Sequence, residues 1–232
     1  MKKVISILLV LCVAASLFAA VTVKAGFDFG TVSTKSLEDK VAGAKDITFK
    51  THGVGFDVAV MGDVAPNLAV YGDVSGVFPI FFKESRNGGA EYTIHKGTDT
   101  DTETDFYFDG FKASSVAFRS GVLYKMNVQG VDLGLGGGLV FSTSKAKFGD
   151  KDFNDYYRVL SRNFGLSLYA TGTYAVAKNV GINLTINPDI YLYNYAASYN
   201  NYDSDTEVCK FEAYGFRAGF AFNASLGVAF SF

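Results

Sequence analysis

The chain has 232 residues, is 49% hydrophobic and carries 21 basic against 23 acidic residues. This length fits one large domain, and the slightly acidic balance argues against a nucleic-acid partner. The sequence contains no phosphate-binding loop, dinucleotide-binding fingerprint or metal-ligand cluster, so we expect no cofactor and no bound metal.

The first 20 residues have the pattern of a secretory signal peptide. Lys2 and Lys3 are followed by the apolar run VISILLVLCVAASLFAA, which ends on small residues. A membrane-spanning helix is the alternative, but the run is barely long enough and no charged stop-transfer segment follows it. We therefore expect residues 1–20 to be removed and residues 21–232 to form the exported domain. Cys209 is then the only cysteine left, so no internal disulfide is expected.

After residue 20, apolar side chains recur at every second position, which is the repeat of a β-strand. The first such segment starts at Val21, and its apolar residues alternate with Thr22, Lys24, Gly26 and Asp28. The same alternation returns along the whole chain and predicts about eight strands. They lie near residues 21–29, 54–60, 70–82, 116–124, 131–141, 164–176, 180–195 and 216–232.

Two prolines interrupt the alternation. Pro79 lies in the third segment and Pro188 in the seventh, and proline cannot donate a hydrogen bond to a β-ladder. We expect a local bulge at each proline. After Pro188 the apolar parity changes to Tyr191, Tyr193 and Tyr195, which we expect to share one face of the strand.

The charged residues of the predicted strands all fall on one face. Alternate residues of a strand point to opposite faces, and every one of these charged residues falls on the face with small or polar residues. None falls on the apolar face. This segregation indicates strands with lipid against the apolar face and a polar lumen behind it. The charges that we expect to line the lumen are Lys24, Asp28, Asp57, Asp73, Arg119, Asp132, Asp189 and Arg217.

Alternation alone does not decide which face is outside, because a soluble barrel alternates too. The lengths of the connections are more informative, since short turns at one end and long loops at the other are typical of transmembrane barrels. Small and hydroxyl residues on the polar parity also fit a narrow interior filled by side chains. Short connections lie near residues 64–67, 125–130 and 177–180, and long polar ones span 31–46, 83–104, 149–159 and 199–208. The sequence therefore predicts an all-β, antiparallel up-and-down transmembrane β-barrel of about eight strands.

The last nine residues, ASLGVAFSF, alternate strictly and end on phenylalanine. This ending resembles the C-terminal signal of bacterial outer-membrane β-barrel proteins, and the whole pattern resembles the small eight-stranded class that includes OmpX, OmpW and the OmpA membrane domain. The resemblance implies a monomer in the outer membrane of a diderm bacterium, in contact with its lipid and recognised during assembly by the barrel-assembly machinery. The residues that match the assembly signal are Phe222, Leu226, Val228, Phe230 and Phe232.

Charges of both signs in a narrow lumen should pair, because an isolated buried charge is costly. We expect Arg119 to group with Asp57 or Asp73, since the three lie at similar heights above the short turns. The first interpretation of this group is a structural ion-pair plug, and the alternative is a gate or selectivity filter.

Two further features suggest chemistry, and both are weak. His52 and His95 are the only histidines and either could lie at the outer rim, but no nucleophile or paired acid accompanies them, so we expect no enzyme. The loop TDTDTETD, residues 98–105, lacks the glycine and the terminal glutamate of a calcium-binding loop and is interpreted as a solvated acidic loop.

Together these features predict an integral outer-membrane barrel with a structural or surface role, or a narrow, porin-like passive conduit for small solutes. A wide porin is excluded because eight strands leave little free interior. The alternative is an OmpW-like protein that binds and transports small apolar molecules from the outer loops through the wall, for which Tyr191, Tyr193 and Tyr195 are the only hint.

Overall fold

The computed structural model describes residues 20–37, 46–86, 91–96, 105–108, 111–149, 157–200 and 206–232. The predicted signal peptide up to residue 19 and most of the acidic loop 98–105 lie outside these ranges. The side chains of His95, Cys209 and Arg217 are not described either. Within the described residues, no helix is long and apolar enough to cross a membrane.

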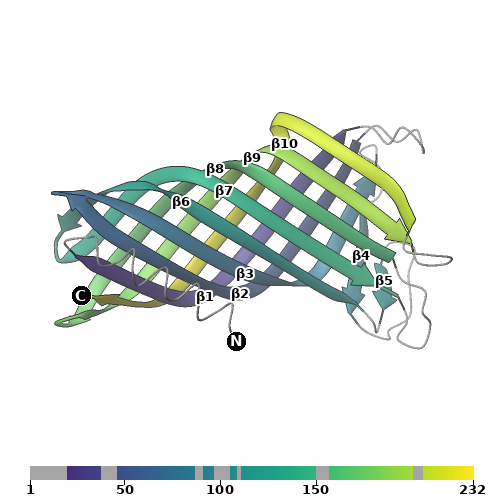
Figure 1. Ribbon diagram of the computed structural model, residues 1–232. Helices are drawn as coiled ribbons and strands as arrows, with labels where there is room; N and C mark the ends of the chain where they lie inside the picture. The colour runs from purple at the N-terminus through teal and green to yellow at the C-terminus, as the bar shows by residue number, and fades with distance from the viewer. Residues whose placement is uncertain are drawn as a thin grey trace.

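Eight antiparallel strands close into a barrel (Figure 1). They pair in the order β2-β1-β10-β9-β8-β7-β6-β3, and the pairing of β2 with β3 closes the ring. Two short strands, β4 and β5, extend the edge of β3 at the end opposite the C-terminus. The strands are β1 (Val21–Leu37), β2 (Asp46–Ala65), β3 (Leu68–Arg86), β4 (Glu91–Lys96), β5 (Asp105–Phe108), β6 (Lys112–Val128), β7 (Val131–Phe148), β8 (Tyr157–Ala177), β9 (Val180–Asn200) and β10 (Thr206–Ser231). The predicted fold class and the number of barrel strands are confirmed.

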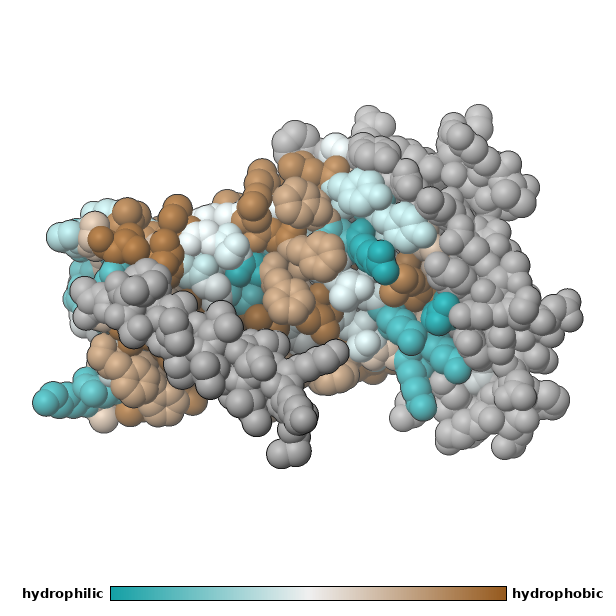
Figure 2. All heavy atoms as spheres, viewed as in Figure 1, coloured by the Kyte–Doolittle hydropathy of each residue, from teal (hydrophilic) through white to brown (hydrophobic). Residues whose placement is uncertain are grey.

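The apolar parity of the strands faces outward. Phe27 and Leu226 have exposed fractions of 78% and 57%, whereas Asp57 and Arg119 on the other parity are 3% and 2% exposed. Figure 2 shows apolar side chains gathered over the outer surface of the barrel. The arrangement is the reverse of a soluble barrel, which points its apolar side chains inward around a core. A wall of this kind is suited to lipid outside and to polar contacts inside.

The short turns lie at the same end of the barrel as Val21, where β1 begins, and Phe232. The turns are two residues long, at 66–67, 129–130 and 178–179. Gln129 and Gly130 both have positive φ, 51° and 84°, as a type I′ hairpin turn requires. At the same end, the amide of Phe232 donates to the carbonyl of Val21 at 2.9 Å. The short-turn end that the sequence predicted is therefore present.

At the opposite end the strands run further than the sequence predicted. β1 and β2 stay paired as far as Leu37 opposite Asp46, so residues 31–37 are strand and not loop. Residues 83–86 likewise continue β3. Beyond the apolar belt the alternation fades from the sequence, but the ladder still satisfies backbone hydrogen bonds there, so the strands continue.

One of the two predicted proline bulges is present and the other is displaced. The β2–β3 register shifts beside Pro79, because Ile80 has no partner in β2. At Pro188 the register between β8 and β9 does not change, so the prediction of a bulge there is wrong. Proline has no backbone N–H to donate, which interrupts the ladder locally but requires no extra residue.

The bulge in β9 lies instead at Leu192, between the pairs that join Tyr191 to Gly165 and Tyr193 to Phe164. An extra residue reverses the facing of every side chain that follows it. Tyr191 is therefore buried in the lumen, while Tyr193 and Tyr195, after the bulge, lie on the opposite face of the strand. The prediction that these three tyrosines share one face is wrong.

A charge on the outward face should destabilise the barrel in a depth-dependent way. We expect Leu226→Arg to cost about 2–4 kcal/mol, because Leu226 lies in the apolar belt, and Val64→Arg, beside a short turn, to cost about 1 kcal/mol or less. Urea unfolding of the protein in phosphatidylcholine vesicles, followed by circular dichroism, measures both. Equal costs at the two positions would contradict a lipid-facing belt.

Candidate functional site in the barrel lumen

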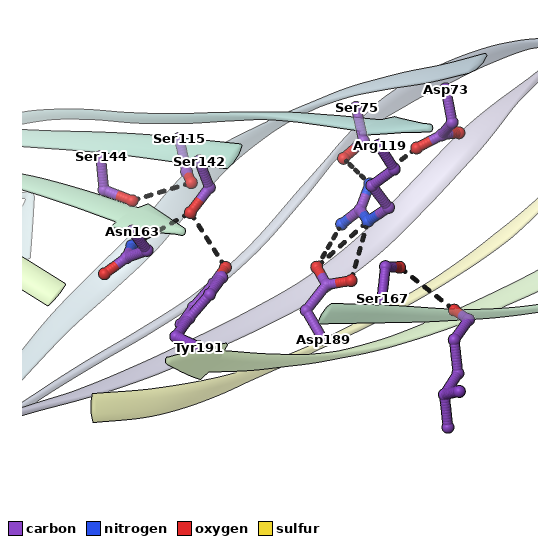
Figure 3. A network of polar contacts seen from close by, with 11 residues as sticks. Asp73, Ser75, Ser115, Arg119, Ser142, Ser144, Asn163, Ser167, Asp189 and Tyr191 are labelled. Carbon is purple, nitrogen blue, oxygen red and sulfur yellow. Dashed lines mark hydrogen bonds and ion pairs between the residues drawn. The ribbon is translucent and has the colours of Figure 1, made fainter. Parts of the chain in front are cut away.

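A buried ion-pair layer crosses the middle of the lumen. Arg119 on β6 lies directly opposite Asp73 on β3 and donates to its Oδ1 at 2.7 Å. The guanidinium also donates to Ser75 Oγ at 2.8 Å and, through Nε and Nη2, to Asp189 on β9 at 2.8–3.1 Å (Figure 3). The side chains of Arg119, Asp73 and Asp189 have no exposed surface. Arg119 thus joins two walls of the barrel, and Asp57 is not its partner.

The planar guanidinium explains why arginine stands here. It presents several donors in a fixed fork, which fits two carboxylates at once. Removal of one partner from such a buried group leaves an uncompensated charge, which costs more than the ion pair itself contributes. The layer therefore resists opening.

Towards the long-loop end, uncharged polar residues continue the filling of the lumen. Ser142 donates to the hydroxyl of Tyr191 at 3.0 Å, and Asn163 donates to Ser142 at 3.0 Å (Figure 3). Ser161 donates to Asn194 at 3.1 Å. These serines and asparagines were not predicted individually. On β8, for example, such residues alternate with Phe164 and Leu166, and this alternation could have identified them as lumen residues.

Towards the short turns, two tyrosines narrow the lumen. The rings of Tyr71 and Tyr169 lie 4.4 Å apart between centroids, packed with Leu123 and Met61. Lys24 lies beside them, 5.9 Å from the centre of the Tyr169 ring, and donates to Thr171. This aromatic layer was not predicted. The lumen residues were identified from their charges, and an uncharged tyrosine on the polar face of a strand carries no such mark.

The structure places most of the predicted lumen charges inside. Lys24, Asp28, Asp57, Asp73, Arg119 and Asp189 are buried. Asp132 is exposed at the rim beside a short turn, where Asn127 donates to it at 2.7 Å, and it lines the mouth of the pocket at that end. Arg217 lies on β10, but its side chain is outside the described part of the chain.

The residues of the predicted assembly signal lie on the outer wall. Each is exposed on β10 or directly after it, along the strand that pairs with β1 to close the barrel. They are Phe222, Leu226, Val228, Phe230 and Phe232.

The described residues place one histidine side chain on the outer wall and hold no cluster of three or more metal-ligating groups. His52 shares the outward parity of Val54 and Phe56 and so does not face the lumen. Among the described side chains, no three or more of His, Cys, Asp and Glu come together as metal ligands.

Two pockets lie on opposite sides of the Arg119 ion-pair layer. The β6 residues that line one pocket precede Arg119, and those that line the other follow it. Ala113 and Ser114 line an outer pocket that has about 30 Å³ of enclosed space and is open to solvent on one side. Leu123 and Lys125 line a pocket with about 150 Å³ of enclosed space near the short turns. Arg119 lies between these two pairs, so the ion-pair layer and the aromatic layer separate the pockets.

Solved structures with a similar fold are outer-membrane proteins. The chain is similar to OprG from Pseudomonas aeruginosa, with a TM-score of 0.59 at 12% identity over 93% of this chain and 96% of that one. It is similar to a major outer membrane protein from Thermus thermophilus, with a TM-score of 0.53 at 16% identity over 90% and 99%. The protease OmpT from Escherichia coli gives a TM-score of 0.50 at 10% identity over 92% and 97%.

These identities show the fold alone. No family model matches the sequence, and no curated protein matches it significantly. The fold and the polar lumen define a small, closed, eight-stranded barrel of the class found in bacterial outer-membrane proteins.

Loss of the central arginine should destabilise the barrel far more than loss of a rim lysine. Arg119→Met leaves Asp73 and Asp189 buried without a counter-charge, and we expect a cost of about 3–5 kcal/mol. Lys125→Met removes the ion pair with Asp63. The side chains of Lys125 and Asp63 are 35% and 30% exposed, so we expect a loss of about 1 kcal/mol or less in the free energy of unfolding. Urea unfolding in detergent micelles compares the two variants. Equal midpoints would contradict a central role for the buried layer.

Proposed function

We propose that the protein is an integral outer-membrane β-barrel with a structural or surface role, and that its lumen is closed in the resting state. The observation that carries the proposal is the Arg119 layer, which has no exposed side-chain surface and is held from two walls. The stacked pair of Tyr71 and Tyr169 lies between this layer and the short turns. A solute would have to break both layers to cross.

The location in the outer membrane is part of the proposal. Three features support it: the signal-peptide pattern of residues 1–20, the outward apolar belt, and the alternating C-terminal segment that resembles an assembly signal. The fold is shared with known outer-membrane proteins. Barrel-assembly machinery and outer-membrane lipid are accordingly the proposed partners, and the barrel is proposed to be a monomer without enzymatic activity.

Conductance tests the closed lumen. In planar bilayers we expect the refolded protein to give no steady current. A variant that removes both layers should give steady openings. It changes Asp73, Arg119 and Asp189 to alanine together, which leaves no single unpaired charge, and it also changes Tyr71 and Tyr169 to alanine. A steady current through the unmodified protein would support the narrow conduit instead and contradict the closed state.

A second candidate function is the binding of small apolar molecules, as in the OmpW-like alternative. The outer pocket favours it, because Val32, Ala146 and Val159 contribute to a mostly apolar lining. Pro79 from β3 and Ala113 from β6 also line the pocket. The pocket therefore lies where these two strands meet.

The hydrogen-bonded ladder between β3 and β6 ends at this place. The described pairs between β3 and β6 stop at Val77 opposite Ser115, two residues before Pro79. Beyond that point β3 pairs with β4, while β6 remains paired with β7 as far as Lys112. A molecule in the outer pocket would therefore face a seam in the barrel wall, as exit through the wall requires.

Filling the pocket should weaken binding of an apolar ligand. We expect Ala146→Phe to bind the dye N-phenyl-1-naphthylamine about tenfold more weakly, which corresponds to about 1.4 kcal/mol. Fluorescence titration of the refolded protein measures this, after the signal of the dye in protein-free micelles is subtracted. Ala224→Phe adds the same ring on the outward parity and is the control. Equal affinities in the two variants would contradict a pocket site.

A further inference from the structure

The described lumen buries more negative charge than positive charge. Asp28, Asp57, Asp73 and Asp189 face only Lys24 and Arg119 among the described buried residues. Arg119 is saturated by Asp73 and Asp189, and Lys24 donates to Thr171. Asp28 and Asp57 therefore hold the excess, and an uncompensated buried carboxylate is costly.

Three of the four oxygens of these two carboxylates lack a hydrogen-bond donor among the described residues. Both oxygens of Asp28 and Oδ1 of Asp57 have no partner among the described residues, and neither has Oδ1 of Asn223. Asp28 is 1% exposed and Asn223 is 4% exposed. All the unpartnered atoms of this group are acceptors, which are the ligands that hard cations take.

The register brings these oxygens over three consecutive inward positions of β1. Asp28 lies opposite Ser225 on β10 and diagonal to Asp57 on β2. Asp57 reaches across β1, because Ser225 hydrogen-bonds to its carboxylate. The two carboxylates therefore lie beside the same serine.

The glycine opposite Asp57 makes room for its carboxylate beside Asp28. A Cβ at Gly26 would lie 2.8 Å from Asp57 Oδ1, which is shorter than real Cβ contacts, so a side chain here would displace that oxygen. Gly30, on the other side of Asp28, makes room for Asn223 in the same way, since its Cβ would lie 2.5 Å from Asn223 Oδ1. The two glycines are four residues apart along β1, about 13 Å, so the Asn223 oxygen lies apart from that of Asp57.

We propose that the lumen binds a calcium-like divalent cation between Asp28 and Asp57. A divalent charge balances the two excess carboxylates, and Ca²⁺ accepts carboxylate and water oxygens in flexible geometry. The ion fastens β1 to β2, the strand beside it. The site shares no residue with the ion-pair layer and does not depend on whether the barrel conducts, so failure of the proposed function would leave it standing.

Calcium titration tests the site. The full chain is refolded in a neutral detergent after treatment with a chelator, and CaCl₂ is titrated by calorimetry at constant ionic strength. We expect saturable binding, a higher thermal unfolding midpoint with Ca²⁺, and the loss of both in Asp28→Asn with Asp57→Asn. Asp132→Asn, at the rim, is the matched control and should bind as the unmodified protein does.

A second pair of variants separates the site from other calcium sites on the chain. Gly26→Ala should weaken binding by pushing the Asp57 carboxylate aside, whereas Gly72→Ala, with nothing within 4 Å of its added Cβ, should not. Binding that persists in the double Asp→Asn variant would assign the ion to the loops and overturn the proposal. A midpoint that does not respond to Ca²⁺ in the unmodified protein would show that no ion fastens the folded barrel, and would overturn the proposal as well.

Discussion

Closure of the β-ladder is the constraint on which the rest of the structure depends. A strand edge in a membrane would leave backbone donors and acceptors without partners, and a barrel removes every edge by pairing the first strand with the last. Here β1 pairs with β10 along most of its length, and β2 pairs with β3 to complete the ring. Once the ring is closed, each side chain has only two directions available, outward or into the lumen.

A closed ring of eight strands leaves a narrow lumen, and this protein fills it in layers. Arg119 joins β3 to β9, Tyr71 stacks on Tyr169, and Tyr191 closes the hydrogen-bonded layer towards the long loops. The layers contribute polar contacts between walls that are far apart in the sequence. The lumen therefore serves as the core of the protein, built from hydrogen bonds and ion pairs where a soluble barrel would use apolar packing.

Irregularities in the ladder are what give this uniform scaffold individual features. Pro79 marks the seam between β3 and β6, where the outer pocket lies. The extra residue at Leu192 turns Tyr191 into the lumen and its neighbours Tyr193 and Tyr195 to the other face. Both features arise at single residues, so they are local departures from a repeat that is otherwise maintained along the barrel.

The sequence by itself determined the number of barrel strands, the sidedness of the strands apart from the end of β9, and the short-turn end, because alternation and turn length are local properties of the chain. It also marked most of the buried charges, and of the two partners expected for Arg119 it named Asp73 correctly and Asp57 wrongly. Only the tertiary structure decided that Asp189 completes that group, that Asp132 stays at the rim, and that Gly26 admits the Asp57 carboxylate. These outcomes depend on register and on closure, which set the height of each residue relative to strands elsewhere in the chain and leave no trace in a period-two pattern.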